Sequence, residues 1–303
     1  MIPLFDLHSD TLFELYKTKQ GIKSNDLAIS LDKASIFSPY IQVLSVWSES
    51  RLNDEDAYNQ YKAILKYAKE QNIKFAKSAS HLKQQAFVLA VEDARILNNT
   101  ISRIYELYDD GVRILTMNWK WATSIGGGWN TDFPLTSFGK DVVKECINLG
   151  IIPDISHSSY IAASQIIDIC EQNGKPLLAS HSNSFSICNH PRNLQNDLFR
   201  RLVESKSAVG ISLVPQHLSC KISCKIDDIL RHIDYYLELG GENCLCLGCD
   251  FDGTTFLPME INDISNLDKL FFRLRDYYGA HLARKIFFEN AYNFFVKNVA
   301  ERS

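Results

Sequence analysis

The chain opens with Ile2-Pro3-Leu4-Phe5-Asp6-Leu7-His8-Ser9-Asp10, where a short apolar run leads directly into a histidine and an aspartate. Short apolar runs of this kind are typical of strands that are buried on both faces. Residues two apart in a strand point to the same face, so the His8 imidazole and the Asp10 carboxylate can reach one cation. The segment therefore predicts a buried first strand that ends in a pair of metal-type ligands.

The same pattern recurs along the whole chain, as apolar runs that alternate with longer segments of helical spacing. The predicted strands are Ile2–Leu7, Ile41–Trp47, Ala86–Val91, Val112–Thr116, Ile151–Ile155, Pro176–Ala179, Ala208–Leu213 and Cys244–Gly248. The predicted helices between them include Asp54–Gln71, Phe138–Leu149, Tyr160–Gln172, Leu194–Glu204 and Ile226–Leu239. About eight strand-then-helix units predict an α/β fold, the (β/α)8 TIM barrel. We expect it to form a single domain over residues 1–303.

An open, doubly wound sheet uses the same alternation of strands and helices and is the alternative fold. Such a sheet normally carries a glycine-rich phosphate-binding turn after its first strand, the place that His8-Ser9-Asp10 occupies here. Gly126-Gly127-Gly128 follows the fourth predicted strand, but it lacks GxGxxG spacing and a P-loop lysine and so indicates a loop. The barrel is therefore the better interpretation.

Composition excludes several classes of function. The formal net charge is -4 and no dense lysine or arginine tract occurs, so a nucleic acid is not an expected partner. No segment approaches the roughly 18 apolar residues of a membrane span, and no secretion signal is recognisable. We therefore expect a cytoplasmic protein with no membrane contact. The phenylalanine-rich segment Leu267–Val299 indicates core or subunit packing and leaves a homodimer open.

Eight cysteines raise the question of disulfides or a structural metal. In a long chain that is expected in the cytoplasm, reduced thiols are the more frequent state. Several cysteines gather between positions 220 and 249, but without the paired CxxC spacing of a structural zinc site. We expect buried free thiols, with a structural zinc site as the alternative.

Polar residues of the metal-binding types stand at or just beyond the ends of several predicted strands. They are His8, Asp10, Glu92, His157, His181 and Asp250. Each has a simpler explanation alone: Asp10 can cap the following helix, Glu92 can lie in a first helical turn, and His181 can hydrogen-bond within a loop. In a (β/α)8 barrel, however, the carboxyl ends of all strands meet at one face. Together these residues predict one site.

The residue types in this set indicate which metal it would hold. Three imidazoles and several carboxylates suit zinc or another borderline divalent metal better than calcium or magnesium. They are too many for one tetrahedral ion, so the set predicts two zinc ions. A carboxylate that spans ions about 3.5–4 Å apart can hold between them a water that is acidified to a nucleophile at neutral pH.

Several short motifs, in order from the first predicted strand to the last, give the chain a family resemblance. They are His8-x-Asp10, Val91-Glu92, Gly111-Val112-Arg113-Ile114-Leu115-Thr116, Leu135-Thr136-x-Phe138-Gly139, Asp154-Ile155-Ser156-His157, Ser180-His181-Ser182-Asn183, Pro191-Arg192-Asn193 and Gly248-Cys249-Asp250-Phe251-Asp252-Gly253. In these motifs the chain resembles the membrane dipeptidase (renal dipeptidase-like, M19) family of zinc peptidases. Fainter similarity continues to Glu289-Asn290.

The resemblance implies how two zinc ions would be bound. His8 and Asp10 would bind one ion. His157 and His181 would bind the other, and Glu92 would bridge both.

The resemblance also implies an activity, a zinc-dependent dipeptidase that acts on dipeptides or similar small carboxylate-bearing amides. Asp250 would take a proton from the bridging water, leaving a bridging hydroxide, and would deliver the proton to the leaving amine. Arg192 would bind both oxygens of the substrate's terminal carboxylate. Asp252 is expected to be structural, because a turn at Gly253 can direct it away from Asp250.

Two positions depart from the family pattern. Many members carry a histidine a few residues after the fourth strand that polarises the substrate carbonyl, and the aligned residue here is Trp119. Losing one such donor typically lowers turnover by about 10²–10³, although the metal ions, Asn118 or Lys120 can supply part of this role. Val214 stands where members often have an aromatic residue that lines the pocket. Both changes predict a bulkier or less polar substrate.

Two alternatives to a dipeptidase stay open from the sequence. A related metal-dependent amidohydrolase would act on N-acyl amino acids, lactams or lactones, which the loss of the usual histidine makes credible. A non-catalytic metal-binding homologue would keep the barrel without turnover.

Overall fold

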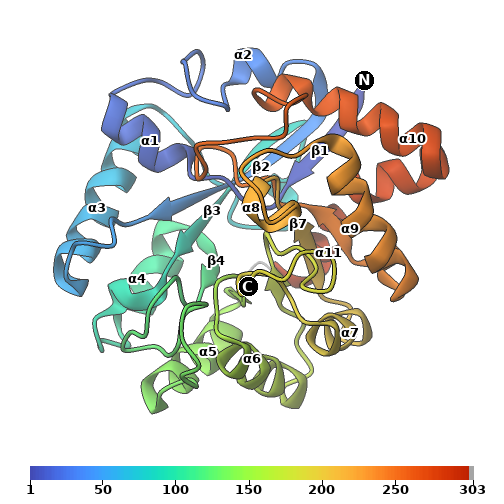
Figure 1. Ribbon diagram of the computed structural model, residues 1–303. Helices are drawn as coiled ribbons and strands as arrows, with labels where there is room; N and C mark the ends of the chain where they lie inside the picture. Colours follow the sequence, from blue (N-terminus) through green and yellow to red (C-terminus); the bar gives the residue numbers. More distant parts are fainter. Residues whose placement is uncertain (300–303) are drawn as a thin grey trace.

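Parallel strands form a closed barrel in which each strand pairs with the next and β8 pairs with β1. The computed structural model describes residues 1–299, and Figure 1 shows the strands at the centre with helices around them. The strands are β1 (Ile2–Asp6), β2 (Phe37–Trp47), β3 (Gln85–Glu92), β4 (Val112–Thr116), β5 (Ile152–Asp154), β6 (Leu178–Ala179), β7 (Ala208–Ile211) and β8 (Leu245–Leu247). This arrangement confirms the predicted (β/α)8 TIM barrel.

Helices cover the outside of the barrel. They are α1 (Thr11–Thr18), α2 (Leu31–Ala34), α3 (Asp54–Glu70), α4 (Arg103–Asp110), α5 (Ser137–Leu149), α6 (Tyr160–Gln172), α7 (Asn196–Glu204), α8 (Pro215–Leu218), α9 (Ile226–Glu238), α10 (Leu267–Arg284) and α11 (Asn290–Asn298). The helix predicted from Leu194 begins at Asn196, because Leu194 is held in an extended bridge with Ser184. Within residues 1–299, no helix combines the length and the apolar character that crossing a bilayer requires.

Only β4 has exactly the predicted bounds, and the other strands differ from them by one to four residues at an end. β2 begins at Phe37, which pairs with Ile2 of β1, and the polar and proline residues that follow Phe37 had hidden this start. β6 ends at Ala179 as predicted but begins at Leu178 and not at Pro176, because the backbone N–H of Leu177 donates to Ser207 Oγ at 3.0 Å. The pattern of apolar residues in the sequence cannot predict side-chain hydrogen bonds of this kind.

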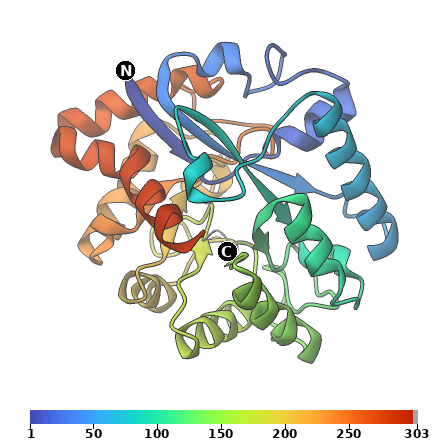
Figure 2. The ribbon, with the colours of Figure 1, turned by 180° about the vertical axis from the view of Figure 1, so that it is seen from behind.

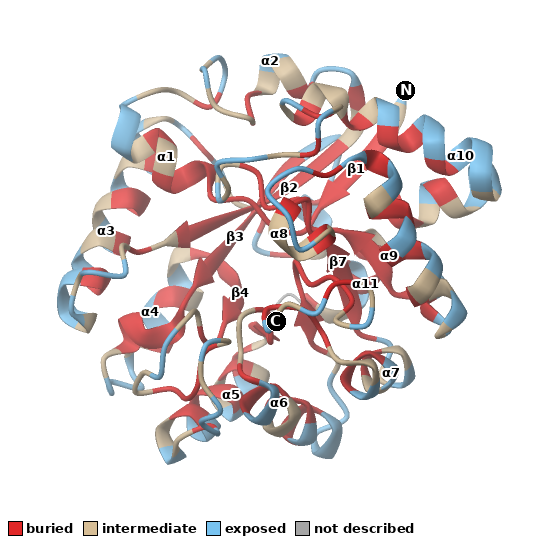
Figure 3. Ribbon diagram, in the orientation of Figure 1, coloured by how far each residue is buried: buried red, intermediate tan, exposed pale blue. Residues whose placement is uncertain are grey.

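The strands separate two layers of the core. Successive strand residues point alternately into the barrel and outward to the helices. The inward layer includes Phe5, Ile41, Val43, Val88, Ala90 and Ile114. The outward layer includes Leu4, Leu44, Val46, Leu89, Val91 and Leu115. Figure 3 shows that the strands are buried over most of their length, whereas the helices bury only one face. The barrel is a filled core that gives the strand ends a rigid support.

The end of the described chain closes the amino-terminal mouth of the barrel, on the side seen in Figure 2. Phe295 of α11 packs on Phe5 of β1, with ring centroids 4.9 Å apart. Phe271 of α10 packs on Phe287 with centroids 5.1 Å apart. The phenylalanines predicted to pack in the core do so, except Phe272, which is 42% exposed.

The cysteine prediction is wrong for one pair, because Cys188 and Cys220 form a disulfide. The other six are buried free thiols, as predicted, and none of them joins a candidate metal group in the described part of the chain. The two paired cysteines lie 32 residues apart and meet only when the loop after β6 docks on the segment after β7. Disulfides are typical of oxidising compartments, and the cytoplasmic location stays a prediction.

Two glycines allow β6 to approach β7 and β8 closely. A Cβ atom at Gly210 would lie 1.9 Å from the carbonyl oxygen of Ser180, and one at Gly248 would lie 1.8 Å from the same oxygen. Only glycine leaves room for this carbonyl. The close approach fixes the backbone that continues into His181.

We expect Gly248→Ala to lower the free energy of unfolding by about 3 kcal/mol, because the added methyl group must displace the backbone of Ser180. Urea denaturation measures this change. Gly174→Asn is the control: Gly174 has φ +60° with open space around it, and asparagine tolerates this conformation, so we expect a change below about 1 kcal/mol. A Gly248→Ala protein as stable as the parent would contradict the close packing.

Candidate active site

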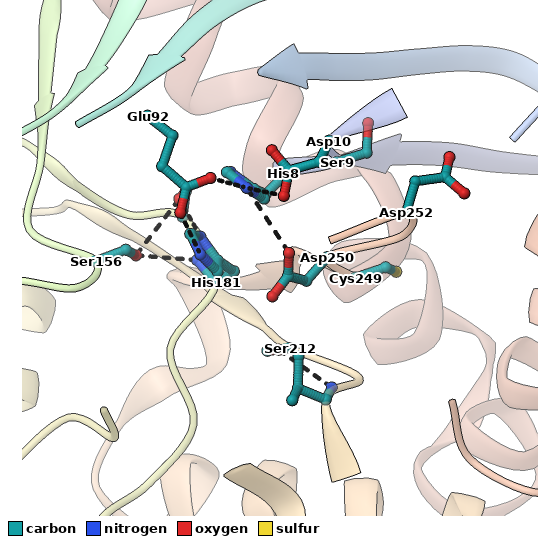
Figure 4. A network of polar contacts seen from close by, with 12 residues as sticks. His8, Ser9, Asp10, Glu92, Ser156, His181, Ser212, Cys249, Asp250 and Asp252 are labelled. Carbon is teal, nitrogen blue, oxygen red and sulfur yellow. Dashed lines mark hydrogen bonds and ion pairs between the residues drawn. The ribbon is translucent and has the colours of Figure 1, made fainter. Parts of the chain in front are cut away.

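Glu92 lies at the centre of the predicted cluster, at the carboxyl end of β3. Its Oε2 lies 3.1 Å from His8 Nε2, and its Oε1 lies 2.9 Å from His157 Nε2. Figure 4 shows the carboxylate extending from β3 toward the imidazoles of His8 and His181. The two oxygens thus face different imidazoles, which is the arrangement that a bridging carboxylate requires.

The remaining ligand-type groups surround this carboxylate. His181 Nε2 lies 2.8 Å from His157 Nε2, and the His181 ring stacks on His8 with centroids 3.8 Å apart. Asp10 Oδ2 and Asp250 Oδ1 lie 3.9 Å and 3.8 Å from His8 Nε2. Three overlapping groups have all their ligand atoms within 4.8 Å of one another: His8, His181 and Asp250; Glu92, His157 and His181; and His8, Asp10 and Glu92. The structure brings together every residue of the predicted metal set.

Several buried atoms of this cluster have no hydrogen-bond partner. They are His8 Nε2, Glu92 Oε2, Asp10 Oδ1 and His157 Nδ1. His8 Nε2 and Glu92 Oε2 face each other across 3.1 Å without the alignment of a hydrogen bond. Burial of unpartnered polar atoms is unfavourable. Imidazole nitrogens and carboxylate oxygens converging on one space are the donor set of zinc and related divalent metals, so these residues fit such cations.

Burial controls the protonation of the cluster. It raises the pKa of Asp10 well above its usual value, and the Glu92 charge raises it further. Burial also raises the pKa of Asp250 to about 6. It lowers the pKa of His157 to about 4 and that of His181 well below its usual value. The neutral imidazoles of His157 and His181 can donate lone pairs to a cation, whereas for His8 burial is outweighed by the Glu92 and Asp10 carboxylates, which together raise its pKa well above its usual value. A cation would relieve the repulsion between the carboxylates.

Asp154, at the end of β5, orients His181, a role that the sequence did not predict. Its Oδ1 accepts hydrogen bonds from the backbone N–H groups of Ser156 and Ser180, each at 2.9 Å. Its Oδ2 accepts from the Ser180 hydroxyl at 2.5 Å, and Ser180 Oγ lies 2.7 Å from His181 Nδ1. Because this hydroxyl donates to Asp154, it accepts from Nδ1–H of His181 and leaves Nε2 free as a ligand. The available signal was a charged residue inside an apolar predicted strand.

Asp6 holds the segment that carries Asp250. Its Oδ1 accepts a hydrogen bond from the backbone N–H of Cys249 at 2.7 Å, and the N–H of Asp250 donates to the carbonyl oxygen of His8 at 3.1 Å. Asp250 and His157 adopt φ values of 63° and 68°. Such left-handed backbone costs about 1–3 kcal/mol for residues other than glycine and persists where the surrounding structure enforces it. Both strained residues belong to the predicted site.

Arg192 is buried beside the cluster and has only neutral partners. It is 4% exposed, its Nη2 donates to the carbonyl oxygen of His181 at 2.9 Å, and its Nη1 donates to Ser182 Oγ at 3.3 Å. Its Nε has no partner. A buried charge is costly without a counter-charge. The site can therefore accept an anionic group next to Arg192.

The loop that carries Arg192 is fixed at two points. The Cys188–Cys220 disulfide joins it to the segment after β7. The side chain of Asn193 donates from Nδ2 to the carbonyl oxygens of Cys188 and His217 at 2.9 Å and 2.8 Å. The position of the guanidinium thus depends on this crosslinked loop.

A cavity of about 260 Å³ opens over the cluster and is bordered by Asp10, Glu92, His157, Asp250, Trp47 and Trp119. Trp119 therefore lies beside the cluster. Asp252 also borders the cavity, but its carboxylate accepts hydrogen bonds from Thr11 Oγ1 and from the backbone N–H of Ala28, each at 2.7 Å. In Figure 4 it lies apart from the contacts that join His8, Glu92 and Asp250. Asp252 thus has structural partners, as expected.

Other residues predicted to contact substrate do not border this cavity. Asn118 is fully buried, and its Oδ1 accepts from Ser158 Oγ at 3.1 Å. Val214 is buried at the start of α8. Lys120 Nζ lies 5.2 Å from the ring centroid of Trp121. The substrate roles of Asn118 and Val214 stay predictions.

An eight-stranded barrel with imidazoles and carboxylates buried at the carboxyl ends of its strands defines the class of metal-dependent hydrolases. Residues 1–302 match the family described as Membrane dipeptidase (Peptidase family M19). The chain belongs to this family of metallopeptidases.

Individual relatives are similar over much of the chain. An uncharacterised protein in the pqqA 5′ region of Klebsiella pneumoniae is 32% identical over 205 residues, which cover 64% of this chain and 74% of that protein. The dipeptidase AC, a metallopeptidase of family M19, has a TM-score of 0.91 at 22% identity and 99% coverage of both chains. A metallopeptidase from Rhodobacter sphaeroides, liganded with a phosphinate mimic of the dipeptide L-Ala-D-Ala, has a TM-score of 0.90 at 22% identity, with 98% of this chain and 99% of that chain covered. These two structures share the fold.

We expect zinc to raise the melting temperature of the metal-free protein by several degrees, because the cation binds the folded cluster and not the unfolded chain. Differential scanning fluorimetry and elemental analysis measure the two effects. Glu92→Gln should lose most of the bound zinc, since Glu92 is central to the cluster. The control Asp252→Asn should keep it. Unchanged zinc content in Glu92→Gln would contradict the assignment of the site.

The disulfide should contribute substantially to stability. We expect the double substitution Cys188→Ser with Cys220→Ser to lower the free energy of unfolding by about 3–4 kcal/mol, the value for a crosslink across roughly 30 residues. Urea denaturation of this variant, and of the parent protein with and without a thiol reductant, measures the effect. Equal midpoints for all of them would show that the crosslink does not stabilise the fold.

Proposed function

We propose that this protein is a zinc-dependent dipeptidase that hydrolyses the amide bond of dipeptides or similar small amides with a free carboxylate. One observation carries the proposal: a buried set of metal ligands lies next to Arg192, a buried guanidinium with only neutral partners. The ligand set supports a centre for two cations. The guanidinium supports a carboxylate at one end of the substrate. Family membership supports the same class of reaction.

The proposed ligands divide between two zinc ions. His8 and Asp10 would hold one ion, and His157 and His181 the other. Glu92 would contact both, because its two oxygens face His8 and His157. When bound, the ions supply Lewis acidity toward the substrate carbonyl and lower the pKa of a water to about 7. The hydrogen bond from His181 to Ser180 keeps Nε2 of that histidine directed at the centre.

Asp250 is the proposed proton carrier. Its carboxylate borders the cavity, with Oδ1 3.8 Å from His8 Nε2. From this place it can take a proton from the attacking water and give it to the amide nitrogen as the C–N bond breaks. The products are one carboxylic acid and one amine, which account for all atoms of the amide and the water.

Arg192 is proposed to select the amide bond that lies next to the substrate's terminal carboxylate. His157 borders both the cavity over the cluster and a smaller pocket of about 40 Å³ that Arg192 lines. A carboxylate beside Arg192 would leave the neighbouring amide beside His157. In any peptide only the last amide bond lies one residue from the terminal carboxylate, and in a dipeptide it is the single amide bond.

An N-acyl amino acid is the second candidate substrate. It also carries a carboxylate one residue from its amide bond, so it satisfies the same contacts with Arg192. Trp119 borders the cavity where the family pattern has a histidine, and its apolar ring suits an acyl group. A single comparison of both substrate types distinguishes the two candidates.

We expect Asp250→Asn to lower kcat on dipeptides by about 10²–10⁴, because the proton carrier is lost. Arg192→Ala should raise KM by about 10–100-fold, the value of charged hydrogen bonds to a carboxylate. Steady-state kinetics on zinc-loaded protein measure both parameters. Asp168→Asn, an exposed substitution on α6, is the control and should leave both unchanged.

Other results would point to the alternatives. Turnover of N-acyl amino acids without turnover of dipeptides would replace the dipeptidase by an amidohydrolase. If neither is hydrolysed by protein with two zinc ions, a metal-binding role is supported. An unchanged kcat in Asp250→Asn, at unchanged zinc content, would contradict the proton carrier.

A further inference from the structure

Three aromatic side chains form one wall of the cavity over the cluster. They are Phe13 of α1, Trp47 at the end of β2 and Trp119 in the loop after β4. Phe13 meets Trp47 edge to face at 5.0 Å and 88°, and Trp47 meets Trp119 at 5.5 Å between centroids. Trp119 in turn lies 6.3 Å from the His157 ring. The wall therefore runs continuously from the cavity rim to the proposed metal ligands.

The wall is held in place before any substrate binds. Phe13 is 6% exposed and belongs to the hydrophobic core, on which Trp47 packs. The backbone carbonyl of Trp119 accepts a hydrogen bond from the N–H of Trp129 at 3.2 Å. A Cβ atom at Gly128 would lie 2.4 Å from the same carbonyl oxygen, so the two segments are in close contact. A preorganised apolar wall binds an apolar group with little ordering cost.

The wall and Arg192 border two different pockets, and both pockets are bordered by His157. His157 borders both pockets, the aromatic side chains border only the larger, and Arg192 borders only the smaller. A substrate whose carboxylate meets Arg192 therefore directs the other side of its amide, the amino-terminal residue, into the larger cavity. The volume of about 260 Å³ can receive a large side chain there.

Glu14 and Asp252, two acidic residues at the cavity rim, already have partners within the protein. Glu14 pairs with Lys17 at 3.1 Å, and Asp252 accepts hydrogen bonds from Thr11 and Ala28. Both carboxylates thus have partners within the protein. The remaining recognition surface is the aromatic faces, which bind apolar and aromatic groups.

We propose that the Phe13–Trp47–Trp119 wall makes the site selective for substrates with a large apolar or aromatic group on the amino side of the scissile amide. This inference rests on the proposed function for the orientation of the substrate. The preferred dipeptides would have phenylalanine, tryptophan or leucine first and a small residue second.

The test compares Phe-Ala with Ala-Ala in two measurements. In zinc-loaded parent protein, we expect kcat/KM for Phe-Ala to exceed that for Ala-Ala by at least about tenfold, as burial of a phenyl group allows. In Asp250→Asn, calorimetry measures the dissociation constants of both dipeptides without turnover, and we expect the same preference. Each dipeptide is used with L- and with D-alanine in second place.

Variants of the wall test the cause of the preference. Trp119→Ala should reduce the ratio of Phe-Ala to Ala-Ala at least about fivefold, and Trp119→Phe should restore most of it. Trp121→Ala is the matched control, because Trp121 is 53% exposed and lies two residues further along the same loop. It should leave the ratio unchanged. Melting temperatures verify that each variant is folded.

The outcomes separate this inference from the proposed function. Equal binding of Phe-Ala and Ala-Ala to folded Asp250→Asn would overturn the inference, with or without turnover in the parent protein. An aromatic preference in binding without hydrolysis of any dipeptide would support the inference and overturn the proposed dipeptidase. An unchanged ratio in Trp119→Ala would show that the wall does not cause the preference.

Discussion

Burial of the Glu92 carboxylate between imidazoles is the constraint on which the rest of the structure depends. Its oxygens face His8 and His157, and the neighbouring Asp10 and Asp250 add further carboxylates at one mouth of the barrel. A low-dielectric environment makes such a group of acids unfavourable unless cations balance it. The filled barrel keeps the ligands together despite this repulsion. The buried carboxylates, which are electrostatically unfavourable, are thus held in place by the packed core of the barrel.

The fold and the grouping of the candidate metal ligands could be predicted because both follow from one regular geometry. The alternation of apolar and helical segments locates each strand in the sequence. In a parallel barrel the carboxyl ends of all strands lie at the same end of the barrel. Residues directly after a run, such as His8 and His157, are therefore assigned to the site without any knowledge of contacts. The starts of β2 and β6 were less accurate, because a pairing at Phe37 and a side-chain hydrogen bond at Leu177 decide them.

The supporting contacts could not be predicted, because they join residues that only the folded chain brings together. The hydrogen bond from Cys249 to Asp6 spans 243 positions, and the Cys188–Cys220 disulfide spans 32. The sequence shows Asp154 as a charged residue inside an apolar run, but it does not show that Asp154 accepts hydrogen bonds from Ser180. The sequence pattern indicates which side chains face a ligand. The residues that orient these side chains through hydrogen bonds can be identified only from the tertiary structure.

The unpartnered atoms at the centre of the cluster also affect how long the protein survives in a cell. Without cations, the folded state loses the stabilisation that metal binding provides, and a larger fraction of molecules opens at any moment. Proteases degrade such open molecules, so a modest loss of stability lowers abundance several-fold. The steady-state level of this protein would then follow the metal supply even at a constant rate of synthesis. Scarcity of metal would remove the molecule itself and not only its activity.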